Sequence, residues 1–288
     1  MRHPTSCLLL AAAVFCIVTT GHCLDEVRLA PPVSAHDQRC AYPYALLHRA
    51  MEATRGTDGP FLTVTLPAVM SRERALRELA AGNITVHVAA TNPRWEAGAI
   101  AVRIPVLKGL LGYRLLLVRE ADLDIYAAVE DMDDLRPLRA GLGEQWTTTA
   151  IFRELGFTVA TGTDYEGLFG MLALGRSDYF PRGINEIYAE WEERWHRYPE
   201  LCIEPTLALY LPTPNYFFVS PRHPHLADRI RRGLELLIAN GEFDAMFRER
   251  YTDAIERAGL GERRIIEIPN PLLTQETPLD RSELWFTP

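Results

Sequence analysis

The stretch SRERALRELAAGNITVHVAA at residues 71–90 indicates the fold class of this chain. Ser71 is a favoured N-terminal cap, and the leucines that follow recur at helical spacing. Gly82 is typical of a helix end, and the apolar run 85–90 is typical of a strand. A helix that passes directly into a strand is the repeating unit of an α/β protein.

The same alternation continues along the chain on both sides of this unit. Apolar runs predict strands at 26–30, 61–66, 113–118, 138–142, 157–161 and 216–219. Helical spacing predicts helices at 42–54, 146–155, 165–174, 184–197, 225–240 and 242–255. The proline-rich tail 263–288 lacks a clear period but keeps several large apolar residues, so we expect it to pack along the surface of the fold.

The N-terminal residues have the layout of a secretory signal peptide. A short basic start precedes the apolar run 7–18, which is too short to span a bilayer comfortably. We expect residues 1–23 to be removed near Cys23 to Asp25 and the protein to be exported to the periplasm. Cys40 and Cys202 then remain, and the sequence leaves open whether they form a disulfide or two separate thiols.

Composition and motifs exclude several classes of function. The formal net charge is −8 without a basic block, which disfavours nucleic acid and anionic membranes as partners. The chain has neither the Gly-x-Ser-x-Gly nor the His-Glu-x-x-His motif, and no cysteine pair has zinc-finger spacing. The sequence therefore predicts no catalytic residues, no metal and no cofactor.

Several segments in a fixed order carry a resemblance to a known family. They are the strand 27–30 after the leader, the unit 71–86, the strand 113–119, the helix ending LALGRSD at 172–178, the strand 216–220, and LADRI at 226–230 with NGEF at 240–243. Together they resemble the periplasmic solute-binding proteins of ABC transporters, of bacterial extracellular solute-binding family 3, the polar amino-acid type. Other motifs indicate a divergent branch.

The resemblance implies a periplasmic-binding-protein-like type II fold, with two α/β lobes joined by two crossing strands. Lobe 1 would comprise 24–112 and 214–288, and lobe 2 would comprise 113–213. Hinge closure traps a ligand in the cleft of such proteins. The strands at 113–119 and 216–220 would be the crossings.

The implied function is capture of a small polar or anionic solute, such as an amino acid, by a monomeric non-enzymatic binding protein. An ABC permease or a membrane sensor would then read the change in lobe angle. Because the same fold also supports catalysis, the alternative is an enzyme such as a dehydratase of a small carboxylated substrate. A third reading is an envelope protein whose ligand site has degraded.

The family pattern Thr-x-x-Arg suggests one ligand contact after the strand 85–90. Here the segment runs from Thr91 to Arg94, so the resemblance makes Arg94 a candidate clamp for a ligand carboxylate. Trp95 is a candidate stacking wall, with a place in the core as the alternative.

The turn GLGEQWTTT at 141–149 resembles the Gly-Thr-Thr turn of the family. Thr147 and Thr148 at a helix start are candidates for holding an anion, or else ordinary caps. Trp146 is a candidate lid over the ligand, whereas Glu144 would repel an anion.

A third candidate group lies at 178–183. We expect Asp178 to bind backbone groups, Tyr179 to be an aromatic wall or a core residue, and Arg182 to face the cleft from a turn between a strand and a helix.

Lys108 is the single lysine among 30 basic residues. It precedes the first predicted crossing strand and differs from arginine in being a compact donor of three hydrogen bonds. We expect Lys108, Arg94 and Arg182 to converge on the cleft and favour an anionic ligand.

Overall fold

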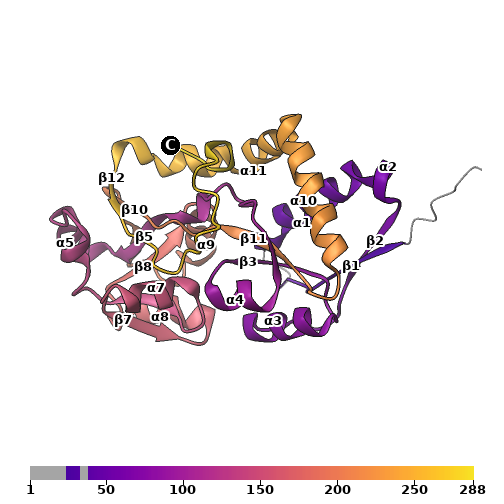
Figure 1. Cartoon of the computed structure of the whole chain (residues 1–288). Helices are drawn as coiled ribbons and strands as arrows, with labels where there is room; N and C mark the ends of the chain where they lie inside the picture. The colour runs from indigo at the N-terminus through magenta and orange to yellow at the C-terminus, as the bar shows by residue number, and fades with distance from the viewer. Residues whose placement is uncertain (1–23, 33–37) are drawn as a thin grey trace, which may run out of the picture.

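The computed structural model describes residues 24–32 and 38–288 (Figure 1). The predicted leader, residues 1–23, lies outside the described residues. Within the part of the chain that is described, none of the helices is both long and apolar enough to cross a membrane.

The first lobe is built on short strands from both halves of the chain. β1 (Asp25–Leu29) pairs in parallel with β2 (Phe61–Thr65), and β11 (Asn215–Val219) lies between β3 (Val86–Ala90) and β4 (Ile100–Val102) in antiparallel register. A hydrogen bond from the Thr85 amide to the Arg28 carbonyl, and one from the Arg28 amide to the Thr85 hydroxyl, join the two groups of strands. They lie together on one side of the molecule (Figure 1).

The second lobe is built on a larger mixed sheet. Its strands run in the order β12-β10-β5-β8-β6-β7, and β9 also pairs with β5. The bounds are β5 Tyr113–Arg119, β6 Ala140–Gly143, β7 Val159–Gly162, β8 Tyr179–Gly183, β9 Leu201–Ile203, β10 Leu207–Tyr210 and β12 Arg264–Glu267.

Helices cover the sheets of both lobes. The first lobe carries α1 (Ala41–Ala53), α2 (Arg55–Asp58), α3 (Arg72–Ala81), α4 (Pro93–Gly98) and α10 (Pro224–Ala239). The second carries α5 (Leu123–Ala127), α6 (Met132–Leu135), α7 (Thr147–Glu154), α8 (Tyr165–Ala173) and α9 (Ile187–Arg194). Helix α11 (Glu242–Ala258) packs its buried aromatic residues against the core of the first lobe.

The unit that predicted the fold class forms as expected. The Ser71 side chain accepts a hydrogen bond from the Arg74 amide at the start of α3. Gly82 ends the helix with φ +79°, a left-handed conformation that favours glycine. These two local signals set the ends of α3. Its first residue, Arg72, contacts the second lobe.

The chain passes between the sheets where the two lobes meet. Strand β5 lies wholly in the large sheet and β11 wholly in the small one, so the connections 103–112 and 211–214 carry the crossings. A hydrogen bond from the Val106 amide to the Asn215 carbonyl ties the two connections together. The division into lobes at fixed residue numbers remains a prediction, and β12 pairs with β10 of the large sheet.

One expectation about local structure was wrong. Residues 179–183 form strand β8 itself, because this run pairs with β5 through the sheet centre, and α9 begins only at Ile187. The tail packs on the molecule as predicted, but its start is strand β12. No disulfide joins Cys40 and Cys202.

Candidate functional site

The two lobes contact each other through a polar junction centred on Arg72. The Arg72 guanidinium extends from the first turn of α3 and donates to the Ala90 carbonyl at the end of β3. It also donates to Thr147 Oγ1, at 3.2 Å, at the start of α7 in the other lobe. The Asn92 side-chain amide lies 3.3 Å from the same hydroxyl. The junction therefore joins the ends of β3 and β6 across the lobes.

The charge of Arg72 is not neutralised by an ion pair. Of the carboxylates in the described chain, none lies within 4.0 Å of this guanidinium, although Glu73 is next to it in sequence. Burial lowers the pKa of Arg72 to about 10, which still leaves it charged at neutral pH. Its charge lies 5.0 Å from the centre of the Trp95 ring, an arrangement that offers modest cation–π stabilisation.

The start of α7 adds further anion-binding character to the junction. Thr147, Thr148 and Thr149 are buried there, and the first turn of the helix contains no acidic residue. Trp146 occupies the cap position without a side-chain capping bond. The first amides of a helix carry partial positive charge, which favours a negatively charged group at this end.

A second buried cation lies behind this junction, in the centre of the large sheet. Arg182 on β8 is 3% exposed and contacts Glu186 at 2.9 Å and Glu190 at 2.6 Å. Burial opposes its charge, but the two carboxylates outweigh burial and raise the pKa of Arg182 well above its usual value. The same pairing lowers the pKa of Glu190. This cluster is internally neutralised.

Aromatic rings connect the two polar groups. The Trp146 ring stacks on Phe180 with centroids 6.0 Å apart and lies 6.5 Å from Tyr165. The Arg182 guanidinium lies 5.0 Å from the Trp146 ring centre. Because Trp146 and Thr147 are adjacent in sequence, the aromatic cluster and the Arg72 junction lie next to each other. The predicted lid residue thus folds back onto its own lobe.

The expected convergence of three cations is not observed. Arg94 is exposed on α4 and pairs with Glu73 of α3. Lys108 Nζ lies 2.6 Å from Asp244 of α11, and Arg182 is paired within its own lobe. Asn92 caps α4 and Pro93 opens it, so the helix turns Arg94 to its outer face.

Trp95 and Tyr179, for which the sequence leaves a ligand wall and the core as alternatives, both lie in the hydrophobic core. Trp95 is 1% exposed and contacts His87 and Phe218. Tyr179 is fully buried beside Tyr126, and burial raises the pKa of its hydroxyl. Asp178 binds the Arg139 amide, which fits its expected structural role.

Lys108 joins the connection 103–112 to the tail. Its ammonium also donates to the Glu283 carbonyl at 2.5 Å, and the Lys108 carbonyl accepts from the Phe286 amide. The backbone of Lys108 has φ +48°, unusual for a residue with a side chain, and Gly109 follows with φ +71°. Lys108 thus holds the C-terminal segment in place through its side chain and its backbone.

The sequence reading missed Arg72, Glu186 and Glu190. A signal for Arg72 was present, because a basic residue in the first turn of a helix lies at the positive end of the helix dipole. Such a residue is unfavourable there unless another contact compensates. The spacing of Arg182, Glu186 and Glu190 gave no comparable signal, since β8 was taken for a turn.

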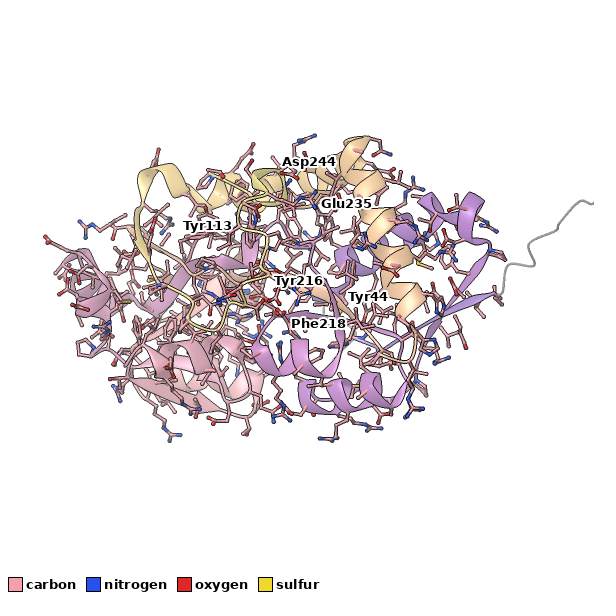
Figure 2. The ribbon with its side chains drawn as sticks, in the orientation of Figure 1. Tyr44, Tyr113, Tyr216, Phe218, Glu235 and Asp244 are labelled. Atoms are coloured by element: carbon pink, nitrogen blue, oxygen red, sulfur yellow. The ribbon has the colours of Figure 1, made fainter. Side chains whose placement is uncertain are left out.

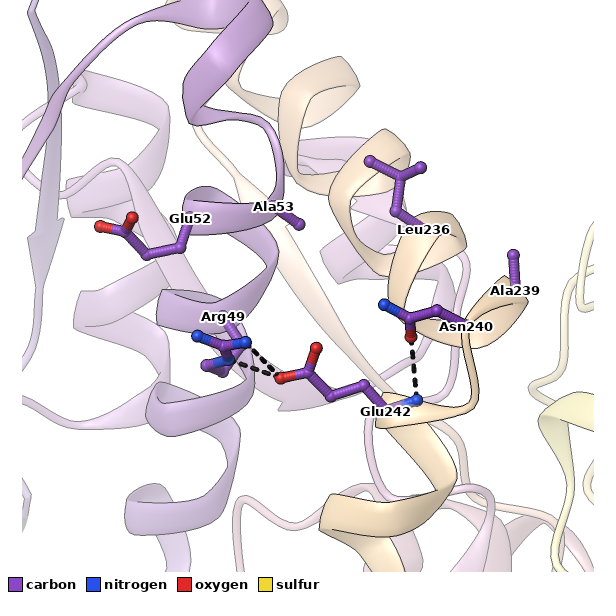
Figure 3. A pocket seen from close by; sticks show the side chains of 7 residues that line it. All are labelled: Arg49, Glu52, Ala53, Leu236, Ala239, Asn240 and Glu242. Atoms are coloured by element: carbon purple, nitrogen blue, oxygen red, sulfur yellow. Dashed lines mark hydrogen bonds and ion pairs between the residues drawn. The ribbon is translucent and has the colours of Figure 1, made fainter.

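Figure 3 shows a separate hollow of about 630 Å³ between α1 and the turn that joins α10 to α11. Its charged groups are Arg49 and Glu242, which pair with each other at 2.6 Å, and Glu52. The hollow lies on the first lobe alone and contains no residue of the junction. We therefore place the candidate site at the junction.

Similarity to known structures supports this two-lobed architecture. An ancestral arginine-binding protein bound to arginine matches with a TM-score of 0.57 at 14% identity, covering 78% of this chain and 98% of that one. A histidine kinase sensor domain with similarity to periplasmic binding proteins matches at 0.56 and 17% identity, covering 80% and 96%. The ancestral amino acid-binding protein AncCDT-1, a precursor of cyclohexadienyl dehydratase, matches at 0.54 and 12%, covering 78% and 95%.

The chain thus has the periplasmic-binding-protein-like type II fold. No family model matches the sequence, and a search of curated proteins gives no match. At these identities the similarity establishes the fold and leaves the function to be argued from the site.

Proposed function

We propose that this protein is an exported solute-binding protein that holds a small carboxylated solute, an amino acid, between its two lobes. The observation that carries the proposal is Arg72. It presents a partly buried guanidinium at the junction of the lobes, fixed by Ala90 and Thr147 and without an ion-paired carboxylate among the described residues.

A carboxylate is the anion that best fits this arrangement. A guanidinium binds a carboxylate through two parallel hydrogen bonds, and the Thr147 hydroxyl and the first amides of α7 supply further donors. Two of these groups come from different lobes, so a bound carboxylate would contact both. A ligand that contacts both lobes stabilises the closed arrangement relative to an open one.

The Arg182 cluster sets a boundary to this site. Its guanidinium is already paired with two carboxylates, so we expect it not to compete for the ligand anion. The Trp146 and Tyr165 rings above it give the site an apolar wall. A ligand with a carboxylate at one end and an apolar or amphipathic body at the other suits these surroundings.

The similar structures provide a consistent context. Several are amino-acid-binding proteins or belong to amino acid ABC transporters, and one is a sensor domain of a histidine kinase. We infer that closure of this protein is read by a membrane partner, either an ABC permease or a sensor. Binding without turnover is our preferred mode, although the likeness to a dehydratase precursor keeps the enzyme alternative open.

A thermal-shift and calorimetry screen of the common L-amino acids tests the proposal, with each hit compared with its α-carboxamide. At a ligand concentration a hundred times Kd, binding stabilises the protein by about 2.7 kcal/mol. The carboxamide should bind much more weakly because it lacks the negative charge of the carboxylate. Equal affinity for acid and amide, or no stabilisation by any carboxylated solute, would contradict the proposal, and product formation would favour the enzyme.

A further inference from the structure

A second hollow of about 390 Å³ lies under the C-terminal segment, away from the Arg72 junction. Figure 2 labels Tyr113 beside this segment, near the upper edge of the large sheet. Five of the lining residues give the hollow its chemical character: Tyr113, Tyr210, Glu267, Trp285 and Phe286. Four are aromatic and one is acidic.

The sheet register places three of these residues in one row. Tyr113 of β5 lies directly opposite Tyr210 of β10, and Tyr210 lies directly opposite Glu267 of β12. Residues opposite one another on neighbouring strands project from the same face of a sheet. The two tyrosine rings are 4.6 Å apart, and the carboxylate completes the row.

The tail supplies the other wall of the hollow. The Phe286 ring meets Tyr113 edge to face at 5.6 Å, and the Phe286 amide is bound to the Lys108 carbonyl. The Trp285 indole donates to the Pro278 carbonyl at 2.8 Å, which fixes its plane. The indole also packs so closely on Gly109 that a side-chain carbon there would lie 2.5 Å from it. The rings are therefore held in place before any ligand arrives.

The charge in the hollow is negative and has no counter-ion in the described chain. Glu267 forms neither an ion pair nor a side-chain hydrogen bond with any described residue, and the lining contains no arginine or lysine. No described cation lies over the rings of Tyr113, Tyr210, Trp285 or Phe286. Arg264, three residues before Glu267, binds the Val129 carbonyl elsewhere.

We propose that this hollow binds a small organic cation with an apolar shell, of the quaternary ammonium class. Aromatic faces and a carboxylate both attract positive charge. A bare ammonium would lose strong hydration that rings cannot replace, whereas a methylated ammonium is weakly hydrated and gains contact with the rings. This site is separate from the carboxylate site of the proposed function and does not depend on it.

Titration of the purified protein with tetramethylammonium chloride, followed by tryptophan fluorescence and NMR, tests this proposal. Saturable binding is expected, with no comparable response to potassium chloride or to tert-butanol, which resembles the probe in shape but is neutral. Glu267→Gln should weaken binding roughly fivefold. Glu262→Gln, an exposed glutamate nearby in sequence, removes the same charge and should leave binding unchanged.

Three results would overturn the proposal: absence of saturable binding, equal binding of tert-butanol, or equal effects of the two glutamine variants. Because Glu267 is exposed, its variant is expected to fold, and equal melting temperatures check this. Tyr210→Leu gives a second test of the aromatic contribution. Retained binding in Arg72→Met separates this hollow from the inter-lobe site.

Discussion

Two arginines, the buried Arg182 and the partly buried Arg72, lie close to the same tryptophan–threonine turn and have opposite surroundings. Arg182 is enclosed by Glu186 and Glu190 and is fully neutralised within its own lobe. Arg72 reaches across the junction, where its hydrogen-bond partners are a carbonyl and a hydroxyl. The difference separates a cation that serves the fold from a cation that is available to a ligand.

The physical reason lies in the cost of burying charge. A buried ion pair compensates much of its desolvation internally, so removal of one partner leaves the other charge unpaired. A buried cation without a carboxylate is unfavourable for stability unless its charge serves another purpose. The two arginines should therefore respond differently to the same substitution.

The largest effect on stability is expected from Arg182→Met. This change leaves Glu186 and Glu190 buried without their cation and should lower the free energy of unfolding by about 3–5 kcal/mol. Urea denaturation measures the loss. The double variant Arg182→Met with Glu190→Gln should recover part of the lost stability. A loss below about 1 kcal/mol for the single variant would contradict the structural role assigned to Arg182.

The stability of the protein at acid pH should depend on His87, whose pKa is affected by Arg72. Burial, and to a smaller extent the charge of Arg72, lowers the pKa of His87 to about 4. The unfolded chain binds this proton near pH 6.5, so stability is retained above that pH and decreases as the pH falls toward 4. Between pH 7 and pH 5 we expect a loss of about 2 kcal/mol from this residue.

Unfolding of the His87→Gln variant at the two pH values checks this expectation. The variant should lose less stability on acidification than the parent protein, because glutamine does not titrate in this range. An identical pH dependence in the two proteins would show that His87 is not the titrating group.

A smaller effect on stability than that of Arg182→Met is expected from Lys108→Met. The lysine pairs with Asp244, whose side chain is 47% exposed, so solvent screens the ion pair. Loss of this contact and of the hydrogen bond to Glu283 should cost about 1 kcal/mol. Calorimetry should show unchanged affinity of the variant for the carboxylated ligand. A large loss of affinity would show that Lys108 contributes to the ligand site.

Local signals in the sequence were sufficient for much of the fold. Ser71 and Gly82 bound α3 as predicted, and most apolar runs became strands within a few residues. These signals act between neighbours in the chain, so they can be read without the tertiary structure. Strand β8 was missed because its central residues include a proline and an arginine, and only pairing with β5 makes this run a strand.

The candidate site could be predicted from the sequence less well than the fold. A helix start has a local signature, which pointed to Thr147, and Thr147 contacts Arg72 at the junction, whereas Trp146, expected as a lid, stacks on Phe180 of its own lobe. The role expected for Arg94 depended on which face of α4 it occupies, and the cap at Asn92 turns it to solvent. Arg72 reaches the junction only because two segments 75 residues apart come together, which a sequence pattern does not encode.

The most direct test of the account is the affinity of Arg72→Met for the best carboxylated ligand of the screen, measured by calorimetry beside Arg74→Met. Arg74 is an exposed arginine two residues further along the same helix and is the matched control. We expect Arg72→Met to weaken binding of the carboxylated ligand by roughly 30-fold or more. We expect its free energy of unfolding to change by less than about 1 kcal/mol. Unchanged affinity in Arg72→Met, with a loss of stability instead, would contradict it.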